Sequence, residues 1–461
     1  MRVAHVSAEV APWARSGGLA EVAGALPRAL AREGLRCAVW LPLYRSARAE
    51  LQRQGLSLRP GPGATRLVEH EGVLQVFVES HLFDREGLYG DGHGAFGDND
   101  ERFALLNRVA VDTAEQVLGG PVDILHAHDW HAALAPHYLR RAGRAHTRSV
   151  FTIHNLAFQG RLDAGAVQRL GMDPAAHHLE GYEWYGGVNL MKAAIADCDA
   201  LTTVSPRYAR EILEPRFGEG LDGFLRVHQG KLSGILNGLD PSWDPRSDPH
   251  IAHTFGPHHW PSGKRANREA LLEGTSLRAE PRDLLVGVIS RLSEQKGLDL
   301  LAELLPRLHE MGVRVFLLGS GEAHLEQAFQ ALAERYSHTL HAHIGFDLGL
   351  ARRILAGCDA LAVPSRFEPC GLTQLQAMRY GCLPVVHATG GLADTVEHGQ
   401  TGFVFEHADV HGLAWALGEA ARVHRDRPTT WKEMARRAMA RDWSWAQPAR
   451  SYLRLYQGLL G

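Results

Sequence analysis

The sequence has few cysteines, no excess of basic residues and no long apolar run, and each absence excludes a class of protein. Its five cysteines among 461 residues are far apart and form no CxxC pair. This argues against a disulfide framework and a thiolate zinc site, and it fits a reducing cytoplasm. Lys and Arg total 49 against 52 Asp and Glu, so neither a nucleic-acid nor a membrane partner is expected. No segment resembles a signal peptide or a membrane span.

Glycine and histidine are abundant instead, with 49 and 27 residues. So much glycine suggests many tight turns between strands and helices. The length is about three times that of a usual domain, which predicts two or three domains. A hydrophobic content of 45% with 22% charged residues is typical of a globular protein and excludes a disordered or fibrous chain.

Short apolar runs alternate with helical patterns along the whole chain. Continuous apolar strands separated by helices predict parallel sheets that are covered on both faces. The first series of predicted strands is Arg2–Ser7, Arg36–Leu41, Val73–Glu79, Asp123–His126, Ser149–His154, Ala200–Val204 and Ser233–Leu236. The second series is Leu284–Ser290, Val313–Leu318, Leu340–Gly345, Ala360–Val363, Leu383–His387 and Gly402–Phe405.

The two series predict an α/β protein with two Rossmann-like domains. The Pro- and Asp-rich segment 240–262 has no periodicity and is interpreted as the linker, which gives domains 1–240 and 241–442. Two internal echoes support a tandem of related folds: Ala196-DCDAL resembles Ala356-GCDAL, and Ser16-GGLAEV resembles Thr389-GGLADTV. Ligands bind beyond the carboxyl ends of parallel strands, so the expected site is a cleft between the two sheets.

The loop Arg15-Ser16-Gly17-Gly18 follows the first strand and opens a helix. Its paired glycines either hold a phosphate with free backbone N–H groups or only form a tight turn. This loop does not carry the G-x-G-x-x-G fingerprint of a dinucleotide-binding turn, and the chain has no P-loop, which disfavours a nicotinamide dehydrogenase.

Histidines gather at the carboxyl ends of two predicted strands, in His126-Ala-His128-Asp129-Trp-His131 and in Thr-Ile-His154. Residues two apart in a strand share a face, whereas the remaining polar groups fall in the following turn, so the spacing suits a zinc ion poorly. We expect no metal here and interpret these polar groups as contacts to a hydroxyl-rich ligand. Two D-x-D matches, at Asp197 and Asp98, are not interpreted as metal sites: the first is a helix–strand junction, and the second is a solvated turn or a helix cap.

A charged loop and an acidic loop mark two strand ends of the second domain. Arg291 and Lys296 offer a planar fork and a point charge, a combination that suits a diphosphate, although such loops are often solvated surface. Glu368 precedes a helix, where it either caps that helix or touches a sugar. The neighbouring Cys370 has no His-rich partner pattern beside it, so packing is favoured over nucleophilic catalysis.

Long motifs in order along the chain resemble the bacterial glycogen synthase and plant starch synthase family. They are Arg15-SGGLAEV, His128-DWH, Thr152-IHNLAFQG, Asn237-GLDPSWDP, Ser290-RLSEQKGLDLL, Phe367-EPCGLTQLQAM, Thr389-GGLADTV and Asp442-WSW. The resemblance implies the GT-B fold, with two Rossmann-like domains facing across a deep cleft and residues 443–461 forming a helix that returns to the first domain. It also implies retaining transfer of glucose from ADP-glucose to the non-reducing end of an α-1,4-glucan such as glycogen or maltooligosaccharides, with no essential metal or other cofactor.

The resemblance also implies roles for individual residues. Arg291 and Lys296 correspond to a diphosphate clamp, Gly17 and Gly18 to N–H donors from the other side, and Glu368 to a carboxylate beside the transferred glucose.

Further positions correspond to sugar and nucleotide contacts. His154 resembles the histidine whose backbone carbonyl faces the reacting sugar, Asp129 the aspartate near its hydroxyls, Tyr89 an aromatic residue near the adenine-side pocket, and Asn237 a glucose contact. Arg15 stands where the family has lysine. The remaining implied donor-binding positions are Cys370, Gly371, Leu372 and Thr373.

Three alternatives stay open. A glucan phosphorylase shares the architecture but needs pyridoxal phosphate bound to a lysine and usually a longer chain. A synthase that uses UDP-glucose in place of ADP-glucose is a second alternative. A non-catalytic glycan-binding protein would have no use for a diphosphate clamp.

Overall fold

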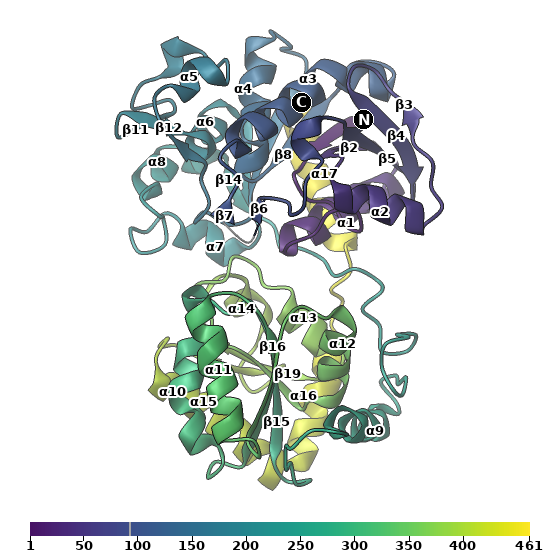
Figure 1. Ribbon diagram of the computed structural model, residues 1–461, viewed down its shortest axis with the longest axis vertical. Helices are drawn as coiled ribbons and strands as arrows, with labels where there is room; N and C mark the ends of the chain where they lie inside the picture. The colour runs from purple at the N-terminus through teal and green to yellow at the C-terminus, as the bar shows by residue number, and fades with distance from the viewer. Residues whose placement is uncertain (92–93) are drawn as a thin grey trace. The chain divides into compact units, whose positions relative to one another are not determined.

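The computed structural model describes residues 1–91 and 94–461, and these form two compact units (Figure 1). Unit 1 comprises Met1–Gly238 together with Ser444–Gly461, and unit 2 comprises Leu239–Trp443. The sequence predicted boundaries after residues 240 and 442, within two residues of these. Each unit has its own hydrophobic core.

Unit 1 is built on a nine-stranded sheet whose central strands are parallel. Its central strands are buried on both faces because helices cover both sides, and polar residues, histidines among them, stand between their apolar residues. In spatial order the strands are β14 (Leu232–Gly234), β13 (Ala200–Thr203), β9 (Arg148–Ile153), β8 (Ile124–His128), β1 (Arg2–Val6), β2 (Arg36–Pro42), β5 (Val73–Val78), β4 (Thr65–His70) and β3 (Arg59–Pro60).

The chain's last helix belongs to unit 1 although unit 2 precedes it in the sequence. It packs against α1, and Tyr456 on it contacts the sheet through His126. The helix labelled α17 in Figure 1 lies within unit 1 accordingly. The helices of unit 1 are α1 (Gly18–Arg32), α2 (Arg45–Arg53), α3 (Asn99–Leu118), α4 (Leu134–Arg141), α5 (Ala166–Arg169), α6 (Leu190–Asp197), α7 (Pro206–Glu211), α8 (Asp222–Val227) and α17 (Ala446–Leu460).

Antiparallel strands are the part of unit 1 that the sequence did not predict. β4 and β3 extend the main sheet with antiparallel pairing. Three short strands form a second sheet, β10 (Arg161–Leu162), β12 (Gly187–Asn189) and β11 (Glu183–Trp184). β6 (Gly90–Asp91) pairs with β7 (Gly94–Ala95).

Unit 2 has a six-stranded, fully parallel sheet. Numbered by their order in this unit, its strands lie in the order 3-2-1-4-5-6, the arrangement of a dinucleotide-type Rossmann fold, and the order reverses between the first and fourth strands. In spatial order they are β17 (Leu340–Ile344), β16 (Val313–Gly319), β15 (Leu284–Ile289), β18 (Ala360–Val363), β19 (Leu383–His387) and β20 (Phe403–Phe405).

Helices and the segment 240–262 complete unit 2. From the sequence, that segment was expected to be a linker, but it packs on unit 2. Asp248 accepts hydrogen bonds from Arg352 (3.0 Å) and Tyr380, and the Arg352 guanidinium lies 4.1 Å from the centroid of the Trp243 ring. The helices are α9 (Trp260–Leu272), α10 (Leu298–Leu308), α11 (Ala323–Arg335), α12 (Leu348–Gly357), α13 (Thr373–Arg379), α14 (Gly390–Thr395), α15 (Val410–Asp426) and α16 (Pro428–Ala440).

The internal echoes occupy equivalent junctions in the two units. In the first echo, Cys198 ends α6 before β13 and Cys358 ends α12 before β18. In the second, paired glycines open α1 and α14. Among the described residues, no helix combines the length and the apolar character that a membrane span requires.

Candidate active site

The reversal of strand order in unit 2 brings Lys296 and Glu368 together. Lys296 lies in a single 3₁₀ turn after β15, and Glu368 lies in the loop after β18. Lys296 Nζ donates to Glu368 Oε2 over 2.6 Å, and Ser365 Oγ donates to the same oxygen over 3.1 Å. Both charged side chains are largely buried, 17% and 11% exposed. The carboxylate therefore pairs with the lysine, and the alternative in which it caps the following helix is not observed.

A second set of contacts fastens these two loops to each other. Arg366 forms a bidentate ion pair with Asp299 at 2.6 and 2.7 Å, and its Nη1 also donates to the Glu294 carbonyl. The backbone N–H of Arg366 donates to the Gln295 carbonyl over 2.9 Å. Bidentate arginine–carboxylate pairs fix geometry as well as charge. These contacts flank the lysine–glutamate pair and hold its two loops in register.

Gly390 and Gly391, the paired glycines of the second echo, pack against the backbone of the Glu368 loop. Gly391 N–H donates to the Glu368 carbonyl over 3.1 Å. At Gly390, where φ is +43°, an added Cβ would lie 1.9 Å from that same carbonyl oxygen. Only glycine permits this close approach. The sequence identified Thr389-Gly-Gly as an echo but missed its role in placing Glu368.

Arg291 presents an unpaired cation at the carboxyl end of β15. Its side chain is exposed and, within residues 1–91 and 94–461, forms no hydrogen bond or ion pair. A guanidinium without a protein partner is available to an anion, as the prediction of a diphosphate clamp requires.

The remaining predicted donor-binding positions of unit 2 follow Glu368 directly. Cys370 is a buried free thiol. Gly371 adopts φ +69°, and the Gln374 side-chain amide donates to the carbonyls of Cys370 and Gly371 at 3.0 and 2.9 Å. α13 begins at Thr373, with Leu372 as its N-cap residue. These contacts fix the turn, and its ligand-binding role stays a prediction.

In unit 1, the glycine loop binds a buried carboxylate that the sequence did not reveal. Glu9, 4% exposed, accepts from Ser16 N (2.5 Å), Ser16 Oγ (2.7 Å) and Gly17 N (3.2 Å). The prediction that the Gly17 N–H is uncovered is therefore wrong. Gly17 is extended at φ −169°, and a Cβ there would meet nothing within 4 Å. The turn itself therefore does not demand glycine at this position.

Tyr89 completes the Glu9 cluster, 80 residues away in sequence. Its hydroxyl donates to Glu9 Oε1 over 2.5 Å, and its ring stacks on His131 at 4.5 Å. Burial and the neighbouring Glu9 carboxylate raise the pKa of Tyr89 well above its ordinary value. Arg15, at the exposed start of the loop, forms an ion pair with Glu21 at 3.3 Å.

Asp129 and His154 lie at the carboxyl ends of β8 and β9, as predicted from their motifs. Asp129 adopts φ +58°, a left-handed conformation that is uncommon outside glycine. Its Oδ1 accepts from the backbone N–H groups of His154 (2.8 Å) and Asn155 (3.3 Å). Burial raises the pKa of Asp129 to about 7, and the charge of Glu9 adds to the effect. Strain and a raised carboxyl pKa are common at functional sites.

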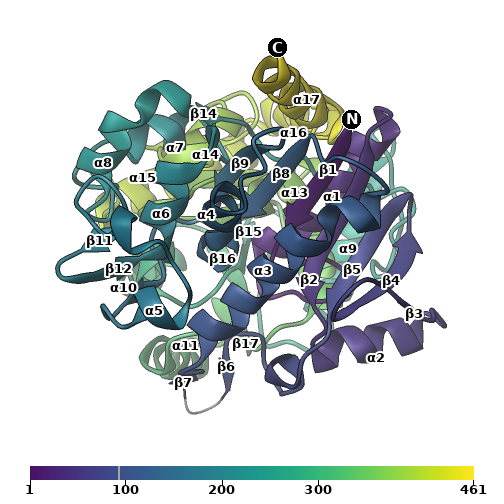
Figure 2. The ribbon, with the colours of Figure 1, turned by 90° about the horizontal axis from the view of Figure 1, so that it is seen from above.

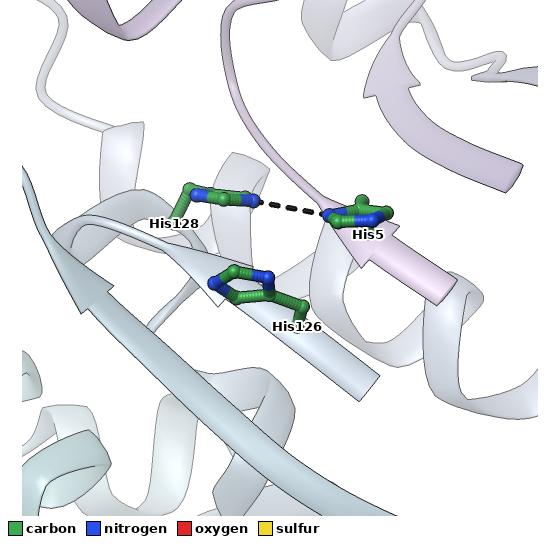
Figure 3. Close-up of side chains that lie close together, drawn as sticks. All are labelled: His5, His126 and His128. Atoms are coloured by element: carbon green, nitrogen blue, oxygen red, sulfur yellow. Dashed lines mark hydrogen bonds between the residues drawn. The ribbon is translucent and has the colours of Figure 1, made fainter. Parts of the chain in front are cut away.

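Three histidines from neighbouring strands lie close together in the core of unit 1 (Figure 3). His5, His126 and His128 are fully buried, and their ligand nitrogens lie within 4.8 Å of one another. His126 contacts Tyr456 Oη (2.7 Å) and Thr152 Oγ1 (2.6 Å) through its two nitrogens.

His128 is likewise engaged on both sides, with His5 Nδ1 at 3.3 Å and His154 Nε2 at 3.0 Å. Burial lowers the pKa of His5 to about 3 and that of His128 well below its ordinary value. The histidines form a neutral hydrogen-bonded network inside the core. The prediction that His126 and His128 contact a ligand directly is therefore wrong, because neither side chain reaches the surface.

Asn237 stands at the end of unit 1. It is 5% exposed, and its Oδ1 has no hydrogen-bond partner in the part of the chain that the structure describes. A buried unpaired amide oxygen fits the predicted contact to a glucose hydroxyl.

Comparison with known proteins decides the family. A family model described as the starch synthase catalytic domain matches residues 2–227, and one described as glycosyl transferases group 1 matches residues 275–438. Glycogen synthases of Rhodopseudomonas palustris (strain BisB18) and Anaeromyxobacter dehalogenans (strain 2CP-1 / ATCC BAA-258) are 42% and 44% identical to this chain. The alignments cover 99% and 100% of it and 96% and 99% of those proteins. The chain belongs to the glycogen synthase and starch synthase family.

Solved structures agree with this family. The catalytic domain of starch synthase IV from Arabidopsis thaliana, bound to ADP and acarbose, is 32% identical, with a TM-score of 0.90 and 99% of each chain covered. A sucrose-phosphate synthase from Thermosynechococcus elongatus, at 17% identity and a TM-score of 0.65 with 99% and 98% of the chains covered, shows the shared fold alone. The predictions of a GT-B fold and of a glycosyltransferase with glycogen synthase function are confirmed.

Proposed function

We propose that this synthase transfers glucose from ADP-glucose to the non-reducing end of an α-1,4-glucan, with retention of the anomeric configuration. The observation that carries the proposal is the Lys296–Glu368 pair, in the loops that follow two adjacent strands at the strand-order reversal of a Rossmann-type sheet, with the exposed Arg291 earlier in the same loop as Lys296. The relative with a solved structure was bound to ADP and acarbose, which are a nucleoside diphosphate and a glucan-like oligosaccharide.

The two cations of unit 2 suit the leaving diphosphate. Arg291 supplies a free fork, and Lys296, with three N–H donors, can hold a phosphate oxygen while it keeps its bond to Glu368. Fixed positive charge where negative charge develops lowers the barrier without any reorganisation during the reaction. Glu368 then stands beside the cations, where it stabilises positive charge that develops on the transferred glucose.

Proton transfer in this proposal does not need a pair of carboxylic acids. In a front-face displacement the departing phosphate oxygen accepts the proton of the acceptor hydroxyl, while the new glycosidic bond forms on the same face of the sugar. Asp129 and His154 in unit 1 remain predicted contacts to the sugar.

The proposed partners are ADP-glucose and α-1,4-glucans, either glycogen or maltooligosaccharides, and the proposed reaction uses no metal or other cofactor. All five cysteines are free and buried, which supports a reducing compartment such as the cytoplasm.

A donor screen tests the proposal. The purified chain is supplied with ADP-, UDP- or GDP-glucose and glycogen, and release of each nucleoside diphosphate is measured. We expect ADP-glucose to be preferred; equal or better turnover of UDP-glucose would contradict the donor assignment. A visible pyridoxal absorbance together with phosphate-dependent glucan breakdown would point to a phosphorylase instead. Product analysis with an α-specific exoglucanase distinguishes retention from inversion.

A further inference from the structure

His387 is the last residue of β19, and each nitrogen of its ring contacts a backbone carbonyl. Nδ1 lies 2.8 Å from the carbonyl oxygen of Ser365, in the loop after β18, and Nε2 lies 3.2 Å from that of Glu406, directly after β20. β18 and β20 are the two neighbours of β19 in the sheet. The ring, which is buried, therefore links the ends of both neighbouring strands.

Two carbonyl partners specify the protonation of this ring. A carbonyl oxygen only accepts hydrogen bonds, so a ring nitrogen that bonds to it must carry a proton. Neutral imidazole has one N–H and satisfies one of the two contacts, whereas imidazolium has two N–H groups and satisfies both. His126 provides the contrast. Its partners Tyr456 and Thr152 are hydroxyls, which donate or accept, so one proton is enough there.

Both connections of His387 lead to Glu368. Ser365 donates its hydroxyl to Glu368 Oε2 over 3.1 Å while its carbonyl faces His387 Nδ1. The chain that follows His387 reaches the same loop, where Gly391 N–H donates to the Glu368 carbonyl over 3.1 Å. The position of the Glu368 loop thus depends on the end of β19 at two points.

The charges at this end of the sheet favour a cation at His387. Burial disfavours an ionised ring, so strong hydrogen bonds and opposite charge must compensate for it. The bonds to both carbonyls are charge-assisted in imidazolium. Besides the Lys296 that reaches Glu368 from the β15 loop, the charged side chains and histidines that follow these strands or lie on α14 are mostly acidic: Arg366, Glu368, Asp394, Glu406, His407 and Asp409.

We propose that His387 is a positioning residue, an imidazolium that donates from both nitrogens and fixes the Glu368 loop against the end of β20. The inference rests on the proposed function for the role of Glu368. His387 acts through Ser365 and does not itself contact the substrate. Loss of either bond lets the loop shift, and a displacement of about 1 Å at a reacting centre can lower a rate by about 10²-fold.

Nuclear magnetic resonance of protein labelled with ¹⁵N in its histidines tests the protonation without any substrate. Two protonated ring nitrogens give similar ¹⁵N shifts, whereas a neutral ring gives two well-separated shifts. The His387 signals are assigned by their loss in the variants described below. His126 on β8, between β9 and β1 in the sheet of unit 1 (Figure 2), is the internal control, and burial lowers its pKa well below the ordinary value. At neutral pH we expect two ring protons on His387 and one on His126.

Three variants test the positioning role, with Tm measured on each. His387→Arg keeps a permanent cation with several donors, and His387→Phe keeps a ring without donors. His398→Gln is the matched control, because it removes another histidine that bonds to β20, through Val404 N–H over 3.1 Å.

We expect His387→Phe to lower kcat by at least about tenfold at an unchanged KM for glycogen. The loss in His387→Arg should be less than about threefold, and His398→Gln should turn over like the wild type.

A single ring proton on wild-type His387 at neutral pH overturns the inference, whatever the variants do. So does a wild-type kcat in His387→Phe, or an equal loss of kcat in His387→Phe and His387→Arg when both keep the wild-type Tm. The proposed function fails separately, if the wild type does not turn over ADP-glucose, because the spectrum needs neither donor nor acceptor.

Discussion

Replacing Asp129 by Asn should stabilise unit 1 at neutral and alkaline pH but not at acidic pH. Burial raises the pKa of this carboxyl from 3.8 to about 7, so the folded protein binds its proton more tightly than the unfolded chain does. Stability therefore falls as the pH rises from the unfolded to the folded pKa. Asn mimics the neutral acid, and its side-chain oxygen can still accept from His154 N.

The magnitude follows from the difference between the two pKa values. A difference of about three pH units corresponds to about 4 kcal/mol in total, at about 1.4 kcal/mol per unit. Most of this penalty develops above pH 5, so the advantage of Asp129→Asn over the wild type should grow by about 2–3 kcal/mol between pH 5 and pH 8.

Urea unfolding at pH 5, 6, 7 and 8, followed for the transition of unit 1, measures this difference. Asp197→Asn is the control, in which the same kind of substitution should lower the free energy of unfolding. Burial raises the pKa of Asp197, but hydrogen bonds from His137 and Arg140 outweigh burial and lower it, so this variant should be less stable throughout. An Asp129→Asn advantage that does not change with pH would refute the reasoning. The wild-type kcat/KM should also fall below about pH 7, and the variant should lose that dependence.

Four further outcomes are expected. Lys296→Ala should raise KM for ADP-glucose and weaken ADP binding while glycogen affinity stays unchanged. An equal loss of glycogen affinity would contradict the assignment of Lys296 to the donor diphosphate. Arg15→Lys should lower kcat/KM for the donor by less than about tenfold, or about 1.4 kcal/mol, and Arg15→Ala should lower it by more. Wild-type kinetics in Arg15→Ala would show that the Arg15 side chain does not bind the donor. Glu9→Ala should destabilise unit 1 by about 1–3 kcal/mol, because the N–H groups of Ser16 and Gly17 would lose their carboxylate acceptor; unchanged urea unfolding would contradict this. Turnover should survive exhaustive chelation, and rescue by Mg²⁺ after loss would contradict a metal-free reaction.

The parallel strands and their helices were predictable because the sequence repeats one simple pattern. Runs such as Leu284–Ile289 are apolar throughout, which is typical of strands covered on both faces. The antiparallel additions were missed for the opposite reason. β4 is mostly polar, and β10 to β12 have only two or three residues each, too few for a period to appear.

The site residues were predicted mainly from motifs, and their mutual contacts were not. Lys296 and Glu368 are 72 residues apart, and no local pattern indicates that they pair. Glu9 is a single carboxylate after a strand, and its role appears only when the fold places Ser16 and Tyr89 against it. His128 was interpreted as a ligand contact because sequence cannot show how deeply a strand end is buried.

The comparison of ADP-glucose turnover in the wild type and in Glu368→Ala tests the central claim most directly. Glucose transfer to maltooligosaccharides is followed at saturating donor, with Tm measured on the same samples. The account predicts a folded variant whose kcat is lower by at least about 10²-fold, because one preorganised polar group at the reacting centre contributes several kcal/mol. A kcat close to that of the wild type, at unchanged Tm, would contradict the placement of the reacting centre at Lys296 and Glu368.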